Sequence, residues 1–317
     1  MKIHLVTPAK ENSRNGNRTS ATRWAGLLRK TGHRVNIDTD YNGEPTDLVI
    51  ALHAWHSAAA IRHYRQIRPD GPLVVALGGT DVNTFLKTDP VTTLASMQMA
   101  DALVCLHALI ADELPLQLRQ KLSVIRQSAL PLPRPRKPSK RYFDICVIGH
   151  LREEKDPFRT ALAARLLPPE SKIRVLHYGK AHSPKWALQA EAEMRANTRY
   201  RWQGEVSAGQ VRQAFMRANL MVISSLQEGG ANVVSEALVA DVPIIASDIS
   251  GNIGLLGSDF AGYFRVGDET SLAEQIRQAE VDERFLKSLE QQGRALAPMF
   301  TPDQELAAWQ KVLAAIT

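Results

Sequence analysis

The chain has 317 residues, 44% of them hydrophobic and 23% charged, and its 39 Lys and Arg against 33 Asp and Glu leave a formal net charge of +6. This length favours two domains, and we expect neither a membrane span, which needs about 20 consecutive apolar residues, nor a signal peptide. The basic residues are scattered rather than clustered, which favours small anionic substrates over nucleic acid.

Short apolar runs alternate with segments of helical period, a pattern typical of parallel sheets wound by helices, so the predicted fold class is α/β. In the first half we expect strands in six runs: IHLVTP, RVNID, DLVIAL, LVVAL, ALVCL and KLSVI. The clearest helix is predicted over 19–30, because four apolar residues fall on one face: Ala21, Trp24, Ala25 and Leu28.

The composition changes at 129–138, which reads ALPLPRPRKP and contains four prolines in ten residues. Proline cannot donate to a strand ladder, so this segment predicts a linker. Strands are expected again in FDICVIG, KIRVLHYG, RYRWQG, LMVIS and VPIIAS. The sequence therefore predicts two Rossmann-like doubly wound domains facing a cleft, one over 1–130 together with a C-terminal helix within 301–317, the other over 139–300.

The C-terminal helix is expected over 302–316, with an apolar face of Leu306, Trp309, Val312 and Leu313. This face needs a partner, which the first domain would provide. The two cysteines, Cys105 and Cys146, each lie in an apolar run without a CxxC pair. Buried free thiols in a reducing cytoplasm are the expectation.

The strongest motif covers 220–247, where an apolar strand is followed by a glycine loop and a helix that begins near Asn232. The start of a helix favours an anion, because its first backbone N–H groups lack partners and the dipole is positive there. Glu228 and Glu236 flank this point, and carboxylates accept hydrogen bonds from vicinal hydroxyls. Both features fit a nucleotide sugar. The alternative is that Glu228 only caps the helix and that Glu236 is a solvated helix residue.

A second motif, GHLREEKDP, follows the first strand of the second half. Lys155 and Arg152 can neutralise the charge that develops on a departing diphosphate, unless they form a solvated helix start beside the acidic residues there. These cations would replace a metal, and no aspartate-x-aspartate signature is present, so no metal or other cofactor is expected.

The first half is expected to carry the acceptor. Its first strand leads into NSRNGNRTSATRW, a cationic loop with four candidate residues: Arg14, Gly16, Asn17 and Arg18. His53 follows a strand and lies at the ligand-binding carboxyl edge of the predicted sheet. Thr80 and Asp81 follow the next strand in LVVALGGTDVN and could face the acceptor. A structural histidine and plain strand-to-helix turns are the alternatives.

The Glu228 and Glu236 motif and GHLREEKDP resemble the retaining glycosyltransferase family 4, which has the two-domain GT-B architecture. The resemblance implies that the first glutamate contacts the donor sugar and the second the ribose. It places Gly149 and Lys155 at the diphosphate, whereas His150 stands where the family has arginine. It also places Glu205 and Val206 at the nucleobase, and His53 at the donor sugar.

Several stretches together are similar to the selenosugar synthases of selenoneine biosynthesis, the SenB type: TPAKENSRNGNRTSATRWA, DLVIALHAWHSA, LGGTDVN, VIRQSALP, VIGHLREEKDPFR, YRWQGE, EGGANVVSEAL and SDISGNIGLLG. The resemblance implies that UDP-N-acetylglucosamine or UDP-glucose reacts with selenophosphate to give a 1-seleno-sugar, UDP and phosphate. Arg14, Asn17 and Arg18 would hold selenophosphate, which needs no strong base.

The predicted catalytic residues are Lys155, Arg152, Glu228 and His53. The predicted donor-binding residues are Gly149, His150, Glu205, Val206, Gly229, Gly230, Ala231, Asn232 and Glu236, and the predicted acceptor-binding residues are Arg14, Gly16, Asn17, Arg18, Thr80 and Asp81. Two alternatives remain: a GT-B transferase with an oxygen or sulfur acceptor, and a non-catalytic nucleotide or nucleic-acid binding protein. A dinucleotide oxidoreductase is disfavoured, because no G-x-G-x-x-G follows either opening strand.

Overall fold

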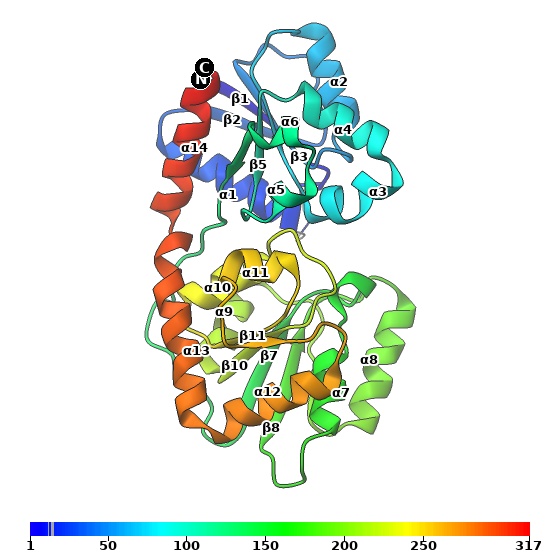
Figure 1. The fold of residues 1–317 in the computed structure, drawn as a ribbon, viewed down its shortest axis with the longest axis vertical. Helices are drawn as coiled ribbons and strands as arrows, with labels where there is room; N and C mark the ends of the chain where they lie inside the picture. Colours follow the sequence, from blue (N-terminus) through cyan, green and yellow to red (C-terminus); the bar gives the residue numbers. More distant parts are fainter. Residues whose placement is uncertain (12, 14–15) are drawn as a thin grey trace. The chain divides into compact units, whose positions relative to one another are not determined.

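The computed structural model describes residues 1–11, 13 and 16–317. Arg14, a predicted acceptor residue, lies outside the described residues. The chain divides into two compact units. Figure 1 draws the chain with colours that follow the sequence. Unit 1 comprises Met1–Ser128 and Pro302–Thr317, and unit 2 comprises Ala129–Thr301. Among the described residues, no helix has both the length and the apolar character that a membrane crossing requires.

Unit 1 contains a six-stranded parallel sheet in the order β2-β1-β3-β4-β5-β6. Its strands are β1 (Lys2–Val6), β2 (Arg34–Asp38), β3 (Leu48–Leu52), β4 (Leu73–Ala76), β5 (Ala102–Cys105) and β6 (Leu122–Val124). Five lie within predicted runs, and β1 begins at Lys2, one residue before the predicted run IHLVTP. The order reverses between β1 and β3, and ligands of doubly wound sheets bind at the carboxyl ends of the strands beside such a reversal.

The helices of unit 1 are α1 (Gly16–Lys30), α2 (Ala58–Ile67), α3 (Leu86–Thr88), α4 (Pro90–Met99), α5 (Ile110–Glu113), α6 (Leu116–Arg119) and α14 (Pro302–Ile316), with a π-helical turn η1 (Asp81–Phe85). Helix α1 buries the four apolar residues predicted for one face. It packs against α14 through Trp24 and Trp309, whose ring centroids are 4.9 Å apart (Figure 1).

Helix α14 has the predicted bounds, but the prediction for one residue of its apolar face is wrong. Leu306 is only partly buried, whereas the neighbouring Glu305 is 1% exposed. A buried carboxylate requires donors, and Glu305 accepts hydrogen bonds from Arg23 Nε at 2.9 Å and Trp24 Nε1 at 2.7 Å. The backbone N–H of Ser128 donates a third at 2.9 Å. Periodicity cannot identify such a position, because these donors come from distant segments.

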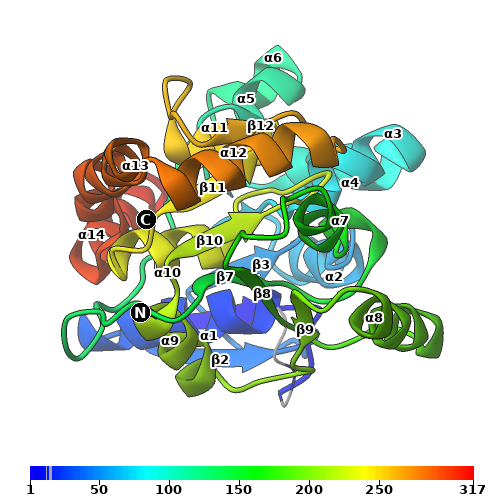
Figure 2. The ribbon, with the colours of Figure 1, turned by 90° about the horizontal axis from the view of Figure 1, so that it is seen from below.

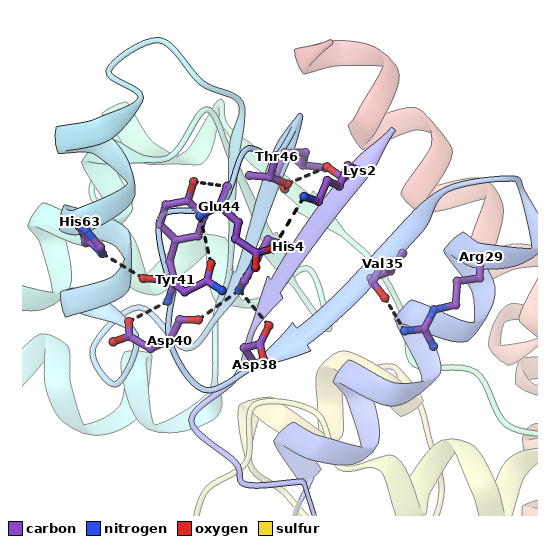
Figure 3. Close-up of polar contacts among 12 residues, drawn as sticks. Lys2, His4, Arg29, Val35, Asp38, Asp40, Tyr41, Glu44, Thr46 and His63 are labelled. Atoms are coloured by element: carbon purple, nitrogen blue, oxygen red, sulfur yellow. Dashed lines mark hydrogen bonds and ion pairs between the residues drawn. The ribbon is translucent and has the colours of Figure 1, made fainter.

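The loop between β2 and β3 is pinned to the sheet by polar contacts around Tyr41, which Figure 3 shows. The Tyr41 hydroxyl donates to the Glu44 carbonyl at 2.7 Å, and His63 Nδ1 donates to the Tyr41 carbonyl at 3.0 Å. On β1, the buried His4 Nε2 lies 3.1 Å from the Asp40 carbonyl and 3.3 Å from an Asp38 carboxylate oxygen. These contacts satisfy the buried polar groups of the loop.

Unit 2 contains a second six-stranded parallel sheet, in the order β12-β11-β10-β7-β8-β9. Its strands are β7 (Phe143–Ile148), β8 (Ile173–Tyr178), β9 (Tyr200–Trp202), β10 (Leu220–Ile223), β11 (Ile244–Ser247) and β12 (Tyr263–Phe264). Five lie in predicted runs. The sixth, β12, was not predicted, because two residues carry no recognisable period. The order reverses between β7 and β10, and doubly wound sheets bind their ligands beside such a reversal.

The helices of unit 2 are α7 (Arg159–Arg165), α8 (Pro184–Ala196), α9 (Ala208–Arg217), α10 (Asn232–Val239), α11 (Ser250–Leu256), α12 (Glu269–Val281) and α13 (Glu283–Leu296), with 3-10 turns η2 (Glu153–Lys155) and η3 (Ala297–Phe300). Figure 2 shows α7 and α12 on one face of the sheet and α9 on the other. The two α/β units have the predicted fold class.

The segment predicted as a linker, 129–138, is hydrogen-bonded to other segments of unit 2 near both of its ends. The backbone N–H of Ala129 donates to the Phe300 carbonyl at 3.0 Å, and that of Lys137 donates to the Met216 carbonyl at 2.9 Å. Cys105 of β5 and Cys146 of β7 are free and buried, as predicted. Burial raises the pKa of both thiols to about 12.

Candidate functional site

The loops that follow β7 and β10 are joined at the reversal point of the unit 2 sheet. The hydroxyl of Ser224, just after β10, donates to the Asp156 carbonyl at 3.0 Å. The backbone N–H of Leu226 donates to the Glu154 carbonyl at 2.9 Å. Asp156 has a left-handed backbone with φ of 42°. This conformation ends the short turn η2 directly after Lys155.

Lys155 and Glu228 form an ion pair at this point, so the structure brings two predicted catalytic residues together. The Ser225 hydroxyl donates to the same Glu228 oxygen at 2.6 Å. The Lys155 side chain is 20% exposed and that of Glu228 is 10% exposed. The methylene stem of Lys155 passes over Gly149, another predicted residue, at 3.9 Å from the position of an added Cβ. The ion pair is therefore held on its protein side and remains reachable from solvent.

The backbone of Glu228 rests on a glycine that the sequence analysis did not single out. A Cβ added at Gly251, in helix α11, would lie 2.4 Å from the Glu228 carbonyl oxygen. Only glycine permits this approach. Ser247 and Asn252 support the same corner, since the Ser247 hydroxyl donates to the Ser225 carbonyl at 2.7 Å and Asn252 Nδ2 donates to the Ser247 carbonyl at 2.9 Å. Gly251 lies within SDISGNIGLLG, a stretch named in the sequence analysis, but nothing in that stretch indicated a contact with the Glu228 backbone.

The glycine loop leads into α10, which begins at Asn232 as predicted. Gly230 has φ of 120°, a value that non-glycine residues rarely adopt. The N-cap residue is Ala231, whose methyl group cannot accept a hydrogen bond from the first turn. Glu236 lies one turn after Asn232 on the same helix and is partly buried. The helix start thus has the local properties of an anion site, and the ribose role of Glu236 stays a prediction.

His150 is a neutral hydrogen-bond donor at the position where the resembled family has arginine. The backbone N–H of Lys180 donates to His150 Nδ1 at 3.1 Å, so the ring proton of the neutral imidazole resides on Nε2. Burial lowers the pKa of His150, and His182, with its ring centroid 5.2 Å away, and Arg152 lower it further. Arg152 pairs with Glu154, at 3.7 Å from Nε to the carboxylate, and not with Glu228.

Glu205 and Val206 lie in the loop after β9. The Gly204 carbonyl accepts a hydrogen bond from the Gly179 backbone at 2.8 Å, which ties this loop to the end of β8. A Cβ added at Gly179 would lie 1.9 Å from the Gly149 carbonyl oxygen, so the loops after β7 and β8 approach closely. Glu205 is exposed and acts electrostatically on His150. Its predicted nucleobase contact remains a prediction.

In unit 1, His53 and Asp81 meet at the carboxyl edge of the sheet. His53 is 3% exposed, Asp81 is fully buried, and His53 Nδ1 lies 2.7 Å from Asp81 Oδ1. The Asp81 carboxylate also accepts hydrogen bonds from the backbone N–H groups of Ala54, Trp55 and Gly78, at 2.8–2.9 Å. Both oxygens of Asp81 are therefore occupied by protein partners, so Asp81 does not contact the acceptor substrate as its strand-end position predicted.

Thr80 and an aromatic group surround His53. The Thr80 hydroxyl lies 2.7 Å from His53 Nε2. The Trp55 ring is stacked on that of Phe85, with centroids 4.1 Å apart, and Phe85 also lies edge-on to His53. Phe85 belongs to η1, and π-helical turns occur frequently at functional sites. Thr80, which is half-buried, remains a residue that a ligand can reach.

The sequence analysis predicted a loop at Gly16, Asn17 and Arg18. In the structure these residues form the first turn of α1. Asn17 and Arg18 are half-buried and Gly16 is exposed. No contact described for these residues joins them to His53 or Thr80, so their acceptor role stays a prediction. Within the described ranges, no three His, Cys, Asp or Glu side chains gather as they would around a metal ion.

Comparisons with known proteins agree with this architecture. HepE of Anabaena, solved in complex with UDP, superposes with a TM-score of 0.79 at 14% identity, over 99% of this chain and 100% of that chain. Sucrose-phosphate synthase of Thermosynechococcus elongatus gives a TM-score of 0.76 at 15% identity, over 99% and 98%. At such identities the likeness shows the fold alone, which is GT-B. A comparison with curated protein sequences finds no match.

The model of one sequence family, "Glycosyl transferases group 1", matches residues 132–296, which is more than half of the chain and nearly all of unit 2. This range includes both loops that hold the Lys155–Glu228 pair and the start of α10. The chain therefore belongs to the group 1 glycosyltransferases.

Proposed function

We propose that the chain transfers a sugar from a UDP-sugar and that unit 2 binds this donor. The observation that carries the proposal is the Lys155–Glu228 pair, which lies at the reversal point of the sheet within the segment that matches the family. HepE, whose fold is similar, has been solved with UDP and with UDP-glucose. Lys155 would bind the diphosphate, and the start of α10 would add backbone donors.

Donor binding would exchange the partners of the ion pair. The diphosphate is a stronger anion than one carboxylate and would draw Lys155 Nζ away from Glu228. The freed Glu228 would accept hydrogen bonds from sugar hydroxyls, while the Ser225 hydroxyl continues to orient it. In the transition state, Lys155 would neutralise charge that grows on the departing UDP, which lowers the barrier by several kcal/mol in a dry site. Glu236 would bind the ribose, and Glu205 and Val206 the nucleobase.

The proposed acceptor is selenophosphate, which rests on the resemblance to selenosugar synthases. Its selenium would attack C1 of the sugar as the C1–O bond to UDP breaks. Water would then cleave the selenium–phosphorus bond and leave a 1-seleno-sugar and phosphate. Arg14, Asn17 and Arg18 would bind the anion, and His53 would contact the donor sugar. UDP-N-acetylglucosamine and UDP-glucose are the proposed donors.

The test is a direct assay of the purified protein. Each UDP-sugar is incubated with selenophosphate, thiophosphate or a simple alcohol, and released UDP and the sugar product are identified by mass spectrometry. We expect UDP and a 1-seleno-sugar only with selenophosphate. Turnover with an alcohol or thiol alone would assign an oxygen or sulfur acceptor instead. Absence of UDP binding together with salt-sensitive binding of nucleic acid would overturn the enzymatic proposal.

A further inference from the structure

The hydrogen-bond ladder between β7 and β8 is interrupted just past the ends of both strands. The backbone N–H of Gly149 still donates to the Tyr178 carbonyl at 2.9 Å. Further on, the N–H of Leu151 donates to the Lys180 carbonyl, again at 2.9 Å. Between these two bonds, a regular parallel ladder would have the Lys180 N–H donate to the Gly149 carbonyl. The Lys180 N–H donates instead to His150 Nδ1 at 3.1 Å, so the Gly149 carbonyl is turned out of the ladder.

A buried histidine of β8 receives this carbonyl. His177 is 1% exposed, and its Nε2 lies 3.0 Å from the Gly149 carbonyl oxygen, while its Nδ1 lies 3.0 Å from the Tyr200 hydroxyl. Burial lowers the pKa of His177 to about 4, so the ring is neutral at pH 7. Because a carbonyl oxygen only accepts, Nε2 carries the proton and donates, and the unprotonated Nδ1 accepts from the Tyr200 hydroxyl. Both ring nitrogens are thus satisfied in one tautomer.

Gly179, just after β8, leaves the space that the turned peptide occupies. A Cβ added there would lie 1.9 Å from the Gly149 carbonyl oxygen and 2.9 Å from the backbone nitrogen of His150. A side chain at this position would therefore push the Gly149–His150 peptide back. The orientation of the peptide is built into both segments, by His177 and Gly179 on one side and by His150 on the other.

The same peptide directs the backbone N–H of His150 away from β8. The C=O and N–H of a trans peptide point in opposite directions, and this C=O points at His177. The side of β7 opposite β8 belongs to β10, which ends at Ile223 and so provides no further carbonyl of a ladder. Among the described residues, the His150 N–H has no hydrogen-bond acceptor. An open backbone donor therefore faces the reversal point of the sheet.

We propose that His177 is a positioning residue that holds the Gly149–His150 peptide so that its N–H donates to a phosphate oxygen of the bound diphosphate. A hydrogen bond from an N–H to an anionic oxygen is stronger than one to a neutral oxygen. The peptide lies beside Lys155, whose side-chain stem is 3.9 Å from the Cβ position of Gly149, so both groups would bind the same anion. The identity of the ligand rests on the proposed transfer from a UDP-sugar, whereas the tautomer of His177 does not.

The first test is nuclear magnetic resonance on the full chain with ¹⁵N-labelled histidine. Two-bond correlations between ring protons and nitrogens distinguish a protonated from an unprotonated nitrogen, and we expect a protonated Nε2 in His177. UDP should move the backbone amide proton of His150 downfield, because a hydrogen bond to an anion deshields the proton. Uridine, which has no phosphate, should leave that proton in place. The variants His177→Gln and His150→Asn identify the two sets of signals by their loss.

The second test compares the affinities for UDP and for uridine. His177→Leu should raise the Kd for UDP about tenfold, the scale of losing one hydrogen bond to a charged group, and leave the Kd for uridine unchanged. His177→Gln should restore most of the affinity for UDP, because its amide can donate to the Gly149 carbonyl and accept from the Tyr200 hydroxyl. The control is Ile276→Ala, which truncates a fully buried side chain of α12 and should change neither Kd in the folded protein.

Equal losses of UDP and uridine affinity in His177→Leu would mean that His177 supports unit 2 as a whole, and the proposal would be wrong. A His177 ring protonated at Nδ1 instead of Nε2 would overturn it as well. If His177→Leu fails to fold, the resonances of the native protein decide. UDP that binds without moving the His150 amide proton would refute the positioning role and leave the proposed function intact, whereas absence of UDP binding by the native protein would overturn both.

Discussion

The two units place a charged group at comparable points of their sheets, yet they leave it in opposite states. In unit 2, Lys155 and Glu228 are 20% and 10% exposed and form an ion pair. In unit 1, His53 and Asp81 are 3% and 0% exposed, and backbone amides complete the carboxylate. An accessible pair can exchange its partner for a ligand, whereas a sealed pair can only hold a side chain in place.

The histidines of the two units differ in the same way. His53 Nδ1 lies 2.7 Å from Asp81 Oδ1 and also accepts a hydrogen bond from the His56 backbone N–H at 3.1 Å. His150 Nδ1 accepts from the Lys180 backbone, so its Nε2 is a donor. Because the partner of one ring nitrogen fixes the role of the other, His150 presents an N–H at Nε2, whereas both ring nitrogens of His53 are occupied by protein partners.

The largest expected effect comes from removing the accessible cation. Lys155→Met should lower kcat by roughly 10²- to 10³-fold, the scale of losing one group that stabilises transition-state charge. It should also weaken UDP binding measured by calorimetry. Lys172→Met is the matched control, since Lys172 is exposed and precedes β8 at the opposite edge of the same sheet. Equal effects of both substitutions would mean that net charge, and not the site, is responsible.

Acid should destabilise both units, because each contains a buried neutral histidine. Burial lowers the pKa of His107 in unit 1 and of His177 in unit 2 to about 4. Between about pH 6.5 and 4 the unfolded chain binds more protons than the folded one, so stability is full above this window and falls with pH within it. Each group contributes at most about 3 kcal/mol. Urea unfolding at pH 7 and 4.5 measures the loss.

The same two histidines distinguish the units further. Neither ring nitrogen of His107 has a hydrogen-bond partner among the described residues, so His107→Leu should be neutral or stabilising at pH 7 and should flatten the pH dependence. His177 bonds the Tyr200 hydroxyl and the Gly149 carbonyl, each at 3.0 Å. His177→Leu should therefore destabilise unit 2 at every pH. A loss of stability in His107→Leu at pH 7 would contradict this contrast.

In each unit one glycine leaves space for the interacting pair, Gly251 beside Glu228 and Gly78 beside His53. Alanine at either position should lower activity. Gly251→Ala would push the Glu228 backbone, and Gly78→Ala would push the His53 ring. Overpacking of this kind costs about 1–3 kcal/mol. Gly251→Ala should weaken UDP-sugar binding, whereas Gly78→Ala should lower kcat alone. Gly26→Ala in α1 is the control, because nothing lies within 4 Å of its added Cβ. It should be stabilising by about 0.5–1 kcal/mol.

The smallest expected effects separate donor from acceptor. Glu236→Ala should raise the KM for the UDP-sugar about tenfold and leave the KM for the acceptor unchanged, since one charge-assisted hydrogen bond is lost. Arg18→Ala should do the reverse. Steady-state kinetics with one substrate varied at a time provide both values. If Arg18→Ala weakened UDP binding as much as acceptor use, its assignment to the acceptor would be wrong.

The sequence by itself determined the α/β class, because apolar period and length decide strand and helix locally. Among the residues that the structure describes, it predicted eleven of the twelve strands, with the two-residue β12 as the exception, and the bounds of helix α14. It also singled out Lys155 and Glu228, because a helix start after a strand is a local pattern with direct electrostatic consequences.

Only the tertiary structure decided what these residues touch. The burial of Glu305 depends on donors from α1 and from Ser128, more than 170 positions away in the sequence. Asp81 looked like a strand-end contact for substrate, but it is saturated by amides from two loops. The tautomer of His150 follows from the backbone N–H of Lys180, 30 positions away. Hydrogen bonding of this kind is set by the approach of distant backbone, which residue order alone does not specify.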